Sequence, residues 1–433
     1  MSEQNKRPNY ALPITMMFAL YFMIAFVTNL QTPFANVVKE QFQLANWQSL
    51  LGNLANFIAY AVMGIPAGLL LQKQGYKRTA LTAVVLGFAG VSITLYAGYI
   101  GNFAVYLSGA FISGFSMCML NTVVNPMLNS LGSNEKKGNQ LNMFGGVFNS
   151  TGGTIAPIFA GILVGQIANP RISDVSPALY VAMSIFALTF IVLSFVQLPE
   201  LHKIKEAVKV KDSHSALSFT HFKLGMIAIF IYVGVEVGIQ AIAYLYMTSA
   251  TNPASGPAGM GMNAGVVGTI VGTYWLLMLA GRLLGGVIAG KVSSKTMLST
   301  ASVIGVVLVL IAMFVPTTMI SFPAFNSQLS ISLQQVPLNV VFLILCGLCT
   351  SVMWSSIFNL ATSGLGKYTA MASGIFMVMV CGGGILPALQ GYVADKTSYM
   401  ASYWVIIIGI AYMFYYAVAG SKNVNKDIKV DVG

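Results

Sequence analysis

Long runs of apolar residues alternate with short polar stretches along most of the chain. A helix that crosses a membrane needs about 20 consecutive apolar residues, because the hydrocarbon layer is about 30 Å thick. The pattern therefore predicts an all-α polytopic membrane protein with twelve transmembrane helices in two six-helix bundles. The expected spans are 12–36, 49–71, 79–98, 103–130, 140–167, 178–198, 224–248, 263–290, 297–318, 338–362, 370–393 and 400–419.

The composition indicates the same class of protein. Hydrophobic residues make up 56% of the 433 residues and charged residues only 8%, which is too apolar for a soluble fold to cover. A net charge of +11 would suggest a nucleic-acid partner for a soluble protein. In a membrane protein the basic residues chiefly set the orientation, so we expect membrane lipid and no nucleic acid as a partner.

Basic residues are distributed very unequally between the loops. If both termini are cytoplasmic, only Lys39, Arg171 and Lys396 of the 22 Lys and Arg residues lie on the outer side. Positively charged loops stay on the cytoplasmic side of a membrane. The distribution thus predicts a multi-pass protein of a plasma membrane, such as a bacterial inner membrane, with both termini in the cytoplasm.

The two halves of the chain repeat a pattern of small residues. A Gly-Gly pair, a proline and a glycine recur at equal offsets in the fifth and eleventh spans, and this is typical of transporters that arose by duplication. The repeated positions are Gly152, Gly153, Pro157 and Gly161, then Gly382, Gly383, Pro387 and Gly391. The expected domains are a bundle at 1–198, a cytoplasmic linker at 199–223, a second bundle at 224–419 and a cytoplasmic tail at 420–433.

The sequence offers no constellation typical of an enzyme. Group transfer in a membrane needs paired carboxylates, a metal or a basic phosphate site, and no such pattern is visible. Cys346 and Cys349 form a C-x-x-C pair, but their neighbours are apolar and supply no further ligand. We therefore expect a monomeric transporter without cofactor, metal site or disulfide.

Amide and aromatic side chains within the spans are the candidates for substrate binding. Polar groups in hydrocarbon face the bundle interior, and amides offer both donors and acceptors to the hydroxyls of a sugar. Aromatic rings can cover the apolar face of a pyranose ring. The alternative is that the amides only join helices and the aromatic rings only fill the interior. The candidates are Asn29, Gln31, Asn53, Asn56, Asn121, Asn125, Asn149, Gln240, Tyr244, Trp275, Trp354 and Asn359.

Charged residues within the spans are rarer. Glu236 is the one acid deep in a span, and it could bind a proton, accept a hydrogen bond from substrate or only pack between helices. Arg282 is expected to snorkel or to hold the inner gate, and Lys73, Lys77 and Arg78 form a basic cluster at the same membrane face. Without a cation at mid-membrane, a neutral substrate is favoured over an anionic one.

Several motifs together resemble one family. They are Tyr232 to Glu236, Asn125-Pro126, Leu131-Gly132, Phe148-Asn149-Ser150, Gly364 to Tyr368, Gly382-Gly383, Pro387 and Leu389-Gln390-Gly391. On these residues the chain resembles the major facilitator superfamily, and within it the fucose/glucose/galactose symporters. The resemblance implies the major facilitator fold and uptake of a hexose or related sugar, driven by a proton or sodium gradient.

The chain departs from this family where coupling is expected. Fucose-transporting members carry acids at the positions of Thr32 and Asn121, and a glutamine at the position of Gly146. Three hypotheses follow: Glu236 binds the proton, sodium binds through amides and backbone carbonyls, or transport is uncoupled. The candidates for coupling are Glu236 and Thr32. The function we expect is cation-coupled import of a neutral sugar. The alternatives are a facilitative uniporter, an exporter of a metabolite or drug, and a sensor that binds sugar without transport.

Overall fold

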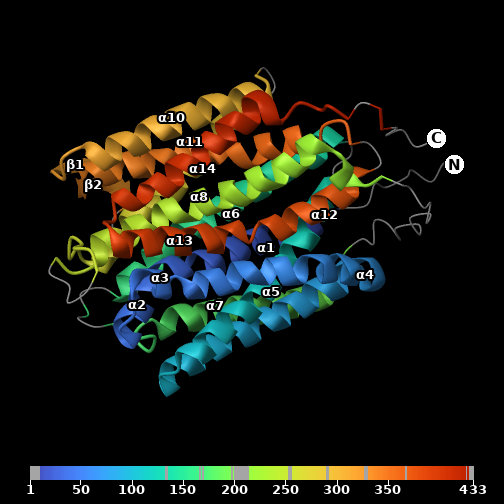
Figure 1. The fold of residues 1–433 in the computed structure, drawn as a ribbon. Coiled ribbons are helices and arrows are strands. Elements are labelled where there is room, and N and C mark those ends of the chain that lie inside the picture. Colours follow the sequence, from blue (N-terminus) through green and yellow to red (C-terminus); the bar gives the residue numbers. More distant parts are fainter. Residues whose placement is uncertain are drawn as a thin grey trace.

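The computed structural model is a bundle of long helices that lie side by side (Figure 1). It describes residues 10–131, 135–164, 167, 170–196, 198, 214–251, 256–288, 292–325, 330–365, 368–425 and 427–428. Within these residues, twelve helical segments are long and apolar enough to cross a membrane. The twelve predicted spans and the all-α fold class are therefore confirmed.

Six of the spans precede residue 199. The first consists of α1 (Ala11–Asn29) and α2 (Gln31–Phe42), so it extends beyond the predicted range 12–36. The short helix α3 (Asn46–Ser49) follows it. The other helices of this half are α4 (Leu51–Ile100), α5 (Phe103–Leu131), α6 (Glu135–Val164) and α7 (Ser176–Phe195).

Helix α4 contains two spans because the chain turns sharply at Gly75. The spans are Leu51–Leu71 and Lys73–Ile100. Gly75 has a φ of 77°, in the left-handed region that a residue without a Cβ adopts readily. The turn places the basic cluster of the sequence at one end of the bundle, which we call the basic end.

The remaining six spans follow a short 3₁₀ turn, η1 (Ala216–Ser218). Helix α8 begins at Thr220, within the predicted linker, and residues 199–213 of that linker lie outside the described residues. The elements are α8 (Thr220–Thr248), α9 (Ala264–Ile288), α10 (Ser294–Phe314), α11 (Leu338–Thr362), α12 (Thr369–Met379), α13 (Gly382–Lys396), η3 (Ala401–Tyr403), α14 (Trp404–Tyr415) and η4 (Tyr416–Gly420).

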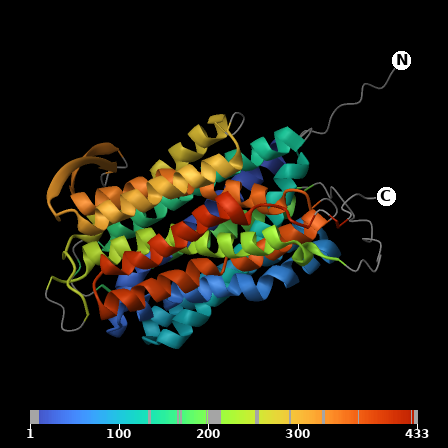
Figure 2. The same ribbon diagram turned by 45° about the horizontal axis from the view of Figure 1, so that its top comes forward.

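An antiparallel hairpin that we did not predict connects α10 to α11. Its strands are β1 (Met319–Phe325) and β2 (Ile331–Pro337). In β2, exposed and half-buried side chains alternate from Ile331 to Gln335, which is the period-two pattern of a strand with one face in solvent. Figures 1 and 2 place the hairpin at one end of the bundle, which we call the hairpin end; it lies opposite the basic end.

The two halves contact each other through a small set of helices. Helix α6 packs against α9, α4 against α12 and α13, and α2 against α8. Glycines allow α6 and α9 to approach closely: a Cβ on Gly161 would lie 2.6 Å from the carbonyl oxygen of Ala264, and one on Gly268 would overlap the carbonyl oxygen of Pro157. Small residues at helix contacts permit this approach in membrane proteins.

Candidate substrate and coupling site

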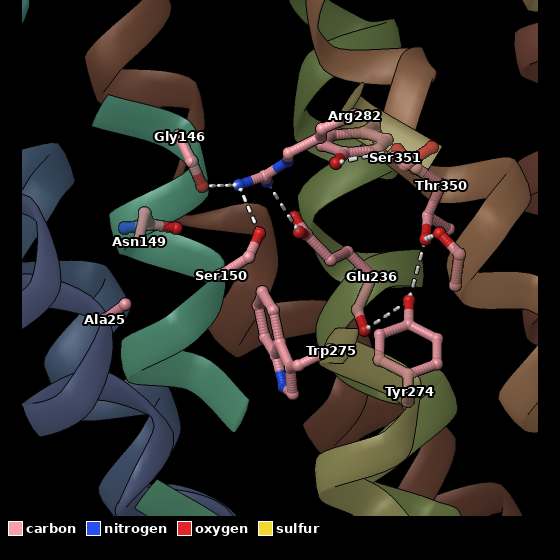
Figure 3. A network of polar contacts seen from close by, with 12 residues as sticks. Ala25, Gly146, Asn149, Ser150, Glu236, Tyr274, Trp275, Arg282, Thr350 and Ser351 are labelled. Atoms are coloured by element: carbon pink, nitrogen blue, oxygen red, sulfur yellow. Dashed lines mark hydrogen bonds and ion pairs between the residues drawn. The ribbon is translucent and has the colours of Figure 1, made fainter. Parts of the chain in front are cut away.

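Glu236 and Arg282 form an ion pair between α8 and α9 (Figure 3). Nη2 of Arg282 lies 3.8 Å from Oε1 of Glu236, and the two side chains are 22% and 11% exposed. The expectation that no cation lies near the middle of the spans is therefore wrong. The sequence position of Arg282 misled us, because its long side chain reaches along the bundle to the carboxylate.

The same guanidinium also contacts the N-terminal half. Nη1 of Arg282 donates to the carbonyl oxygen of Gly146 and to Oγ of Ser150, both at 2.9 Å and both on α6. Figure 3 shows the guanidinium between α6 and the carboxylate of Glu236. Arg282 thus connects one acid of its own half to two acceptors of the other half.

Trp275 lies on the same helix as Arg282, about two helical turns closer to the start of α9, and between the two halves. Its Nε1 donates to Oε1 of Gln240 over 2.6 Å, and both side chains are buried. A Cβ added to Gly153 on α6 would lie 2.8 Å from the Trp275 ring and 3.3 Å from Nδ2 of Asn29. Gly153 is therefore the point where an amide of α1 and the indole of α9 come together.

A second layer holds the backbone of Glu236 in place. The hydroxyl of Tyr274 lies 3.0 Å from Oγ1 of Thr350 and donates to the carbonyl oxygen of Glu236 at 3.4 Å. The hydroxyl of Tyr232 donates to the carbonyl oxygen of Thr350 at 3.1 Å. These buried contacts connect α8, α9 and α11, so hydrogen bonds to the two neighbouring helices hold the part of α8 that carries Glu236.

The amides of the N-terminal half form a connected chain. The hydroxyl of Tyr21 donates to Oδ1 of Asn125 at 2.5 Å, and Nδ2 of Asn125 donates to the carbonyl oxygen of Asn121 at 2.8 Å. Nδ2 of Asn121 donates in turn to the hydroxyl of Tyr60 at 3.0 Å. Nδ2 of Asn149 lies 3.4 Å from the carbonyl oxygen of Tyr21, which links α6 to α1.

Comparison with known proteins identifies the family. The model of the Major Facilitator Superfamily matches residues 17–388. The chain belongs to the Major Facilitator Superfamily.

Relatives of this superfamily member are named as sugar transporters. A glucose/galactose transporter of Brucella abortus (strain 9-941) is 27% identical, over 98% of this chain and 97% of the relative. The L-fucose-proton symporter of Escherichia coli (strain K12) is 23% identical, over 89% and 88% of the two chains. The predicted resemblance is thus confirmed, and so is the expectation of a transporter rather than an enzyme.

Solved structures of the superfamily share the fold of this facilitator. The crystal structure of FucP in the outward conformation superposes with a TM-score of 0.68 at 22% identity, covering 96% of this chain and 100% of that one. A bacterial homologue of the lysosomal transporter Spinster, inward-facing and occupied, gives a TM-score of 0.69 at 12% identity, covering 98% and 99%. At these identities the likeness shows the major facilitator fold.

Some of the predicted binding residues join helices instead of gathering near Trp275. Nδ2 of Asn53 donates across the halves to the carbonyl oxygen of Gly383 at 2.8 Å. Nδ2 of Asn56 lies 3.3 Å from the carbonyl oxygen of Ala110 within its own half. Oε1 of Gln31 accepts from the hydroxyl of Tyr106 at 3.1 Å. For these amides the helix-joining interpretation accounts for the observed contacts.

Other candidates lie apart from the ion pair or outside the description. Asn359 is exposed, and Trp354 packs edge-on against Tyr232 with ring centroids 6.0 Å apart. Tyr244 is buried, and its hydroxyl has no hydrogen-bond partner among the described residues. The side chain of Thr32 lies outside the described residues.

The other predicted gate residues remain in their own half. Nζ of Lys77 donates to the carbonyl oxygen of Ser194 at 2.8 Å, which joins α4 to α7. Lys73 and Arg78 are exposed at the basic end. Among these four residues, only Arg282 has a described contact with the opposite half.

Sequence reasoning missed two residues that shape this site. Tyr21 could not be distinguished from the other aromatic residues of the apolar spans, and Ser150 was not selected because its neighbour Asn149 is the more polar residue. A usable signal was present in α6: Gly146, Ser150 and Gly153 are spaced four and three residues apart, so they lie on one helix face. This face of small residues is the one that Arg282 and Trp275 contact.

Proposed function

We propose that this facilitator imports a neutral sugar, a hexose or a close relative, by alternating access between its two halves. The nearness of both Asn29 and Trp275 to Gly153 carries the proposal, because it brings an amide and an aromatic face to one place between the bundles. Amides pair with sugar hydroxyls, and an indole ring covers the apolar face of the sugar. The names of the relatives, glucose/galactose transporter and L-fucose-proton symporter, support a sugar as the substrate class.

We further propose that uptake is coupled to a cation through Glu236. While Glu236 is ionised, its charge is balanced by Arg282 at 3.8 Å. A proton on Glu236 would remove that balance and leave Arg282 with its acceptors on α6 alone, which changes the energy of the contact between the halves. Sodium bound by the same carboxylate would act in the same direction.

Arg282 is then the inner gate of the proposal. Its bonds to Gly146 and Ser150 cross from α9 to α6, so the halves cannot separate at this level while the bonds persist. Opening toward the basic end requires that they break. Glu236 and the two α6 acceptors share one guanidinium, that of Arg282. The ionisation of Glu236 would therefore affect whether the transporter opens toward the basic end.

The orientation and domain division belong to the same proposal. The excess of Lys and Arg at the basic end supports a cytoplasmic location for that end and for both termini, in a bacterial inner membrane. We assign residues 1–198 and 224–419 to the two moving bundles, with the linker 199–223 and the tail 420–433 in the cytoplasm.

Reconstitution tests the proposed function directly. The purified chain is placed in liposomes, and entry of labelled glucose, galactose and fucose is measured with and without imposed proton and sodium gradients. Accumulation driven by one gradient supports symport and identifies the ion. Equilibration that ignores both gradients would establish a uniporter. Sugar binding without flux would indicate a sensor, and neither binding nor entry would favour an exporter of another solute.

A further inference from the structure

Polar side chains of the two halves meet at the hairpin end, far along the bundle from Arg282. Within the described residues they come from α2 and α3 on one side and, on the other, from the residue that follows α8, from α13 and from the loop after α13. We call this group the end latch. It consists of Lys39, Asn46 and the backbone N–H of Trp47 in the N-terminal half, and Ser249, Asp395 and Tyr399 of the C-terminal half.

Asp395 caps a helix of the opposite half. Helix α3 begins after Ala45, which has no side-chain oxygen to accept from the free backbone N–H groups of the first turn. Asp395 accepts instead: Oδ1 lies 3.2 Å from the backbone N of Asn46 and 2.6 Å from its Nδ2, and Oδ2 lies 3.0 Å from the backbone N of Trp47. A negative charge at a helix N-terminus is stabilising, so the cap joins α13 to α3.

Lys39 and Tyr399 complete the latch. Nζ of Lys39 donates to Oδ1 of Asn46 at 2.8 Å and to Oγ of Ser249, in the other half, at 3.0 Å. The hydroxyl of Tyr399 lies 2.9 Å from Oδ1 of Asn46 and 2.7 Å from Oγ of Ser249. Burial raises the pKa of Tyr399 to about 12, so this hydroxyl keeps its proton at neutral pH.

The backbones are also close at this level. A Cβ on Gly391 of α13 would lie 2.9 Å from a side-chain carbon of Leu50 and 3.1 Å from the Cα of Trp47. A larger residue there would require the Leu50 side chain and the backbone at Trp47 to shift. Hydrogen bonds to charged groups and tight packing thus hold the two halves together at the hairpin end.

We propose that the end latch is the gate at the hairpin end, and that Asp395 and Lys39 set the balance between its closed and open states during transport. The proposal rests on the alternating access proposed above. A carrier that opens toward the hairpin end has to break every contact between Asp395 and α3. Because Asp395 and Lys39 sit apart from Glu236, their replacement should shift this balance without altering the sugar site.

Distance measurements between spin labels test the latch without any need for transport. Cysteines replace Ala104 on α5 and Thr397 after α13, which are exposed and belong to opposite halves at the hairpin end. The full chain is labelled in lipid nanodiscs, and the label distances are recorded by pulsed electron spin resonance. A chain without the two added cysteines shows whether the four buried native thiols react.

Asp395→Asn is the decisive variant. The amide offers one acceptor where the carboxylate offers two, and it turns a donor toward the N–H groups of α3. We expect the ratio of long to short distances to rise about tenfold, which corresponds to about 1.4 kcal/mol. Lys39→Met and Ser249→Ala should shift the ratio in the same direction, and Ser249→Ala leaves every charge in place.

Asp174→Asn is the matched control. Asp174 accepts from the backbone N of Arg171 at 2.8 Å within its own loop, so its replacement should leave the distances unchanged. Distances in Asp395→Asn and Ser249→Ala that equal those of the unsubstituted chain would overturn the latch, even if sugar uptake is observed. Distances that shift as expected while no sugar enters would support the latch and contradict the proposed function.

Discussion

The carboxylate of Glu236 faces the guanidinium of Arg282 at 3.8 Å, and the same guanidinium reaches two acceptors on the opposite half of the molecule. An acid that can gain or lose a proton is thereby placed next to a cation that joins the halves. Coupling through this pair requires no second acid. This is consistent with the sequence, which has Thr32 and Asn121 at the positions where fucose-transporting relatives are expected to carry acids.

Replacement of Glu236 should separate coupling from transport. Glu236→Gln keeps the shape of the side chain but cannot change charge, and Arg282 retains its bonds to Gly146 and Ser150. We expect gradient-driven accumulation to fall to the level of equilibration, while exchange of labelled for unlabelled sugar continues. Asp174→Asn, in the loop before α7, is the control and should accumulate sugar normally. Undiminished accumulation by Glu236→Gln would eliminate this acid as the coupling group.

Gly153 offers a test of the proposed sugar site. In Gly153→Ala the new methyl group would lie 2.8 Å from the Trp275 ring and 3.3 Å from Nδ2 of Asn29, so the indole has to shift from its present position. Overpacking of this kind costs about 1–3 kcal/mol, and we expect the KM for the sugar to rise about tenfold or more. Gly68→Ala is the control, because no atom lies within 4 Å of its added Cβ. Equal KM values for the two variants would place the sugar elsewhere.

The hydrogen bond of Trp275 makes a separate contribution. Trp275→Phe keeps an aromatic face but loses the 2.6 Å bond from Nε1 to Gln240. The bond fixes the orientation of the ring; with its net worth of about 1 kcal/mol taken as the cost of binding sugar to a ring that is not fixed, we expect sugar affinity, measured by equilibrium binding, to fall about fivefold. Trp404→Phe changes a tryptophan that is 48% exposed on α14 and should bind sugar as before. If both variants bind equally well, Trp275 only fills the interior.

The spans could be predicted because each depends on a local run of apolar residues. The twelve ranges match the helices to within a few residues in most cases, and Gly75 accounts for the turn between the second and third spans. The hairpin at Met319–Pro337 was missed because its alternation is short and lies between two strong apolar runs. A local pattern that weak does not stand out beside a helix signal.

The candidate site could be predicted only in part, because it depends on which helix faces meet. Glu236 and Gln240 were found from their polarity and Trp275 from its aromatic ring, and the three lie on the neighbouring helices α8 and α9. Asn53 and Asn56 have the same residue type and similar depth, yet one bonds across the halves and the other within its half. No periodicity in the sequence distinguishes those two environments, since both follow from long-range packing.

Gln390 on α13 gives a prediction about stability rather than transport. Its side chain is fully buried, and neither its oxygen nor its nitrogen has a hydrogen-bond partner among the described residues. A buried amide without partners costs about 1–3 kcal/mol, whereas methionine has a similar length and no such cost. Gln390→Met should therefore raise the thermal unfolding midpoint in detergent by a few degrees.

Gln335→Met is the control for this change, because Gln335 is exposed on β2 and should have little effect on the midpoint. A lower midpoint for Gln390→Met, with Gln335→Met unchanged, would mean that the amide of Gln390 has hydrogen-bond partners in the folded protein, for example a bound water between α8 and α13. Such a water would make Gln390 part of the polar interior of the C-terminal half, beside Gly238, whose added Cβ would lie 2.5 Å from Oε1 of Gln390.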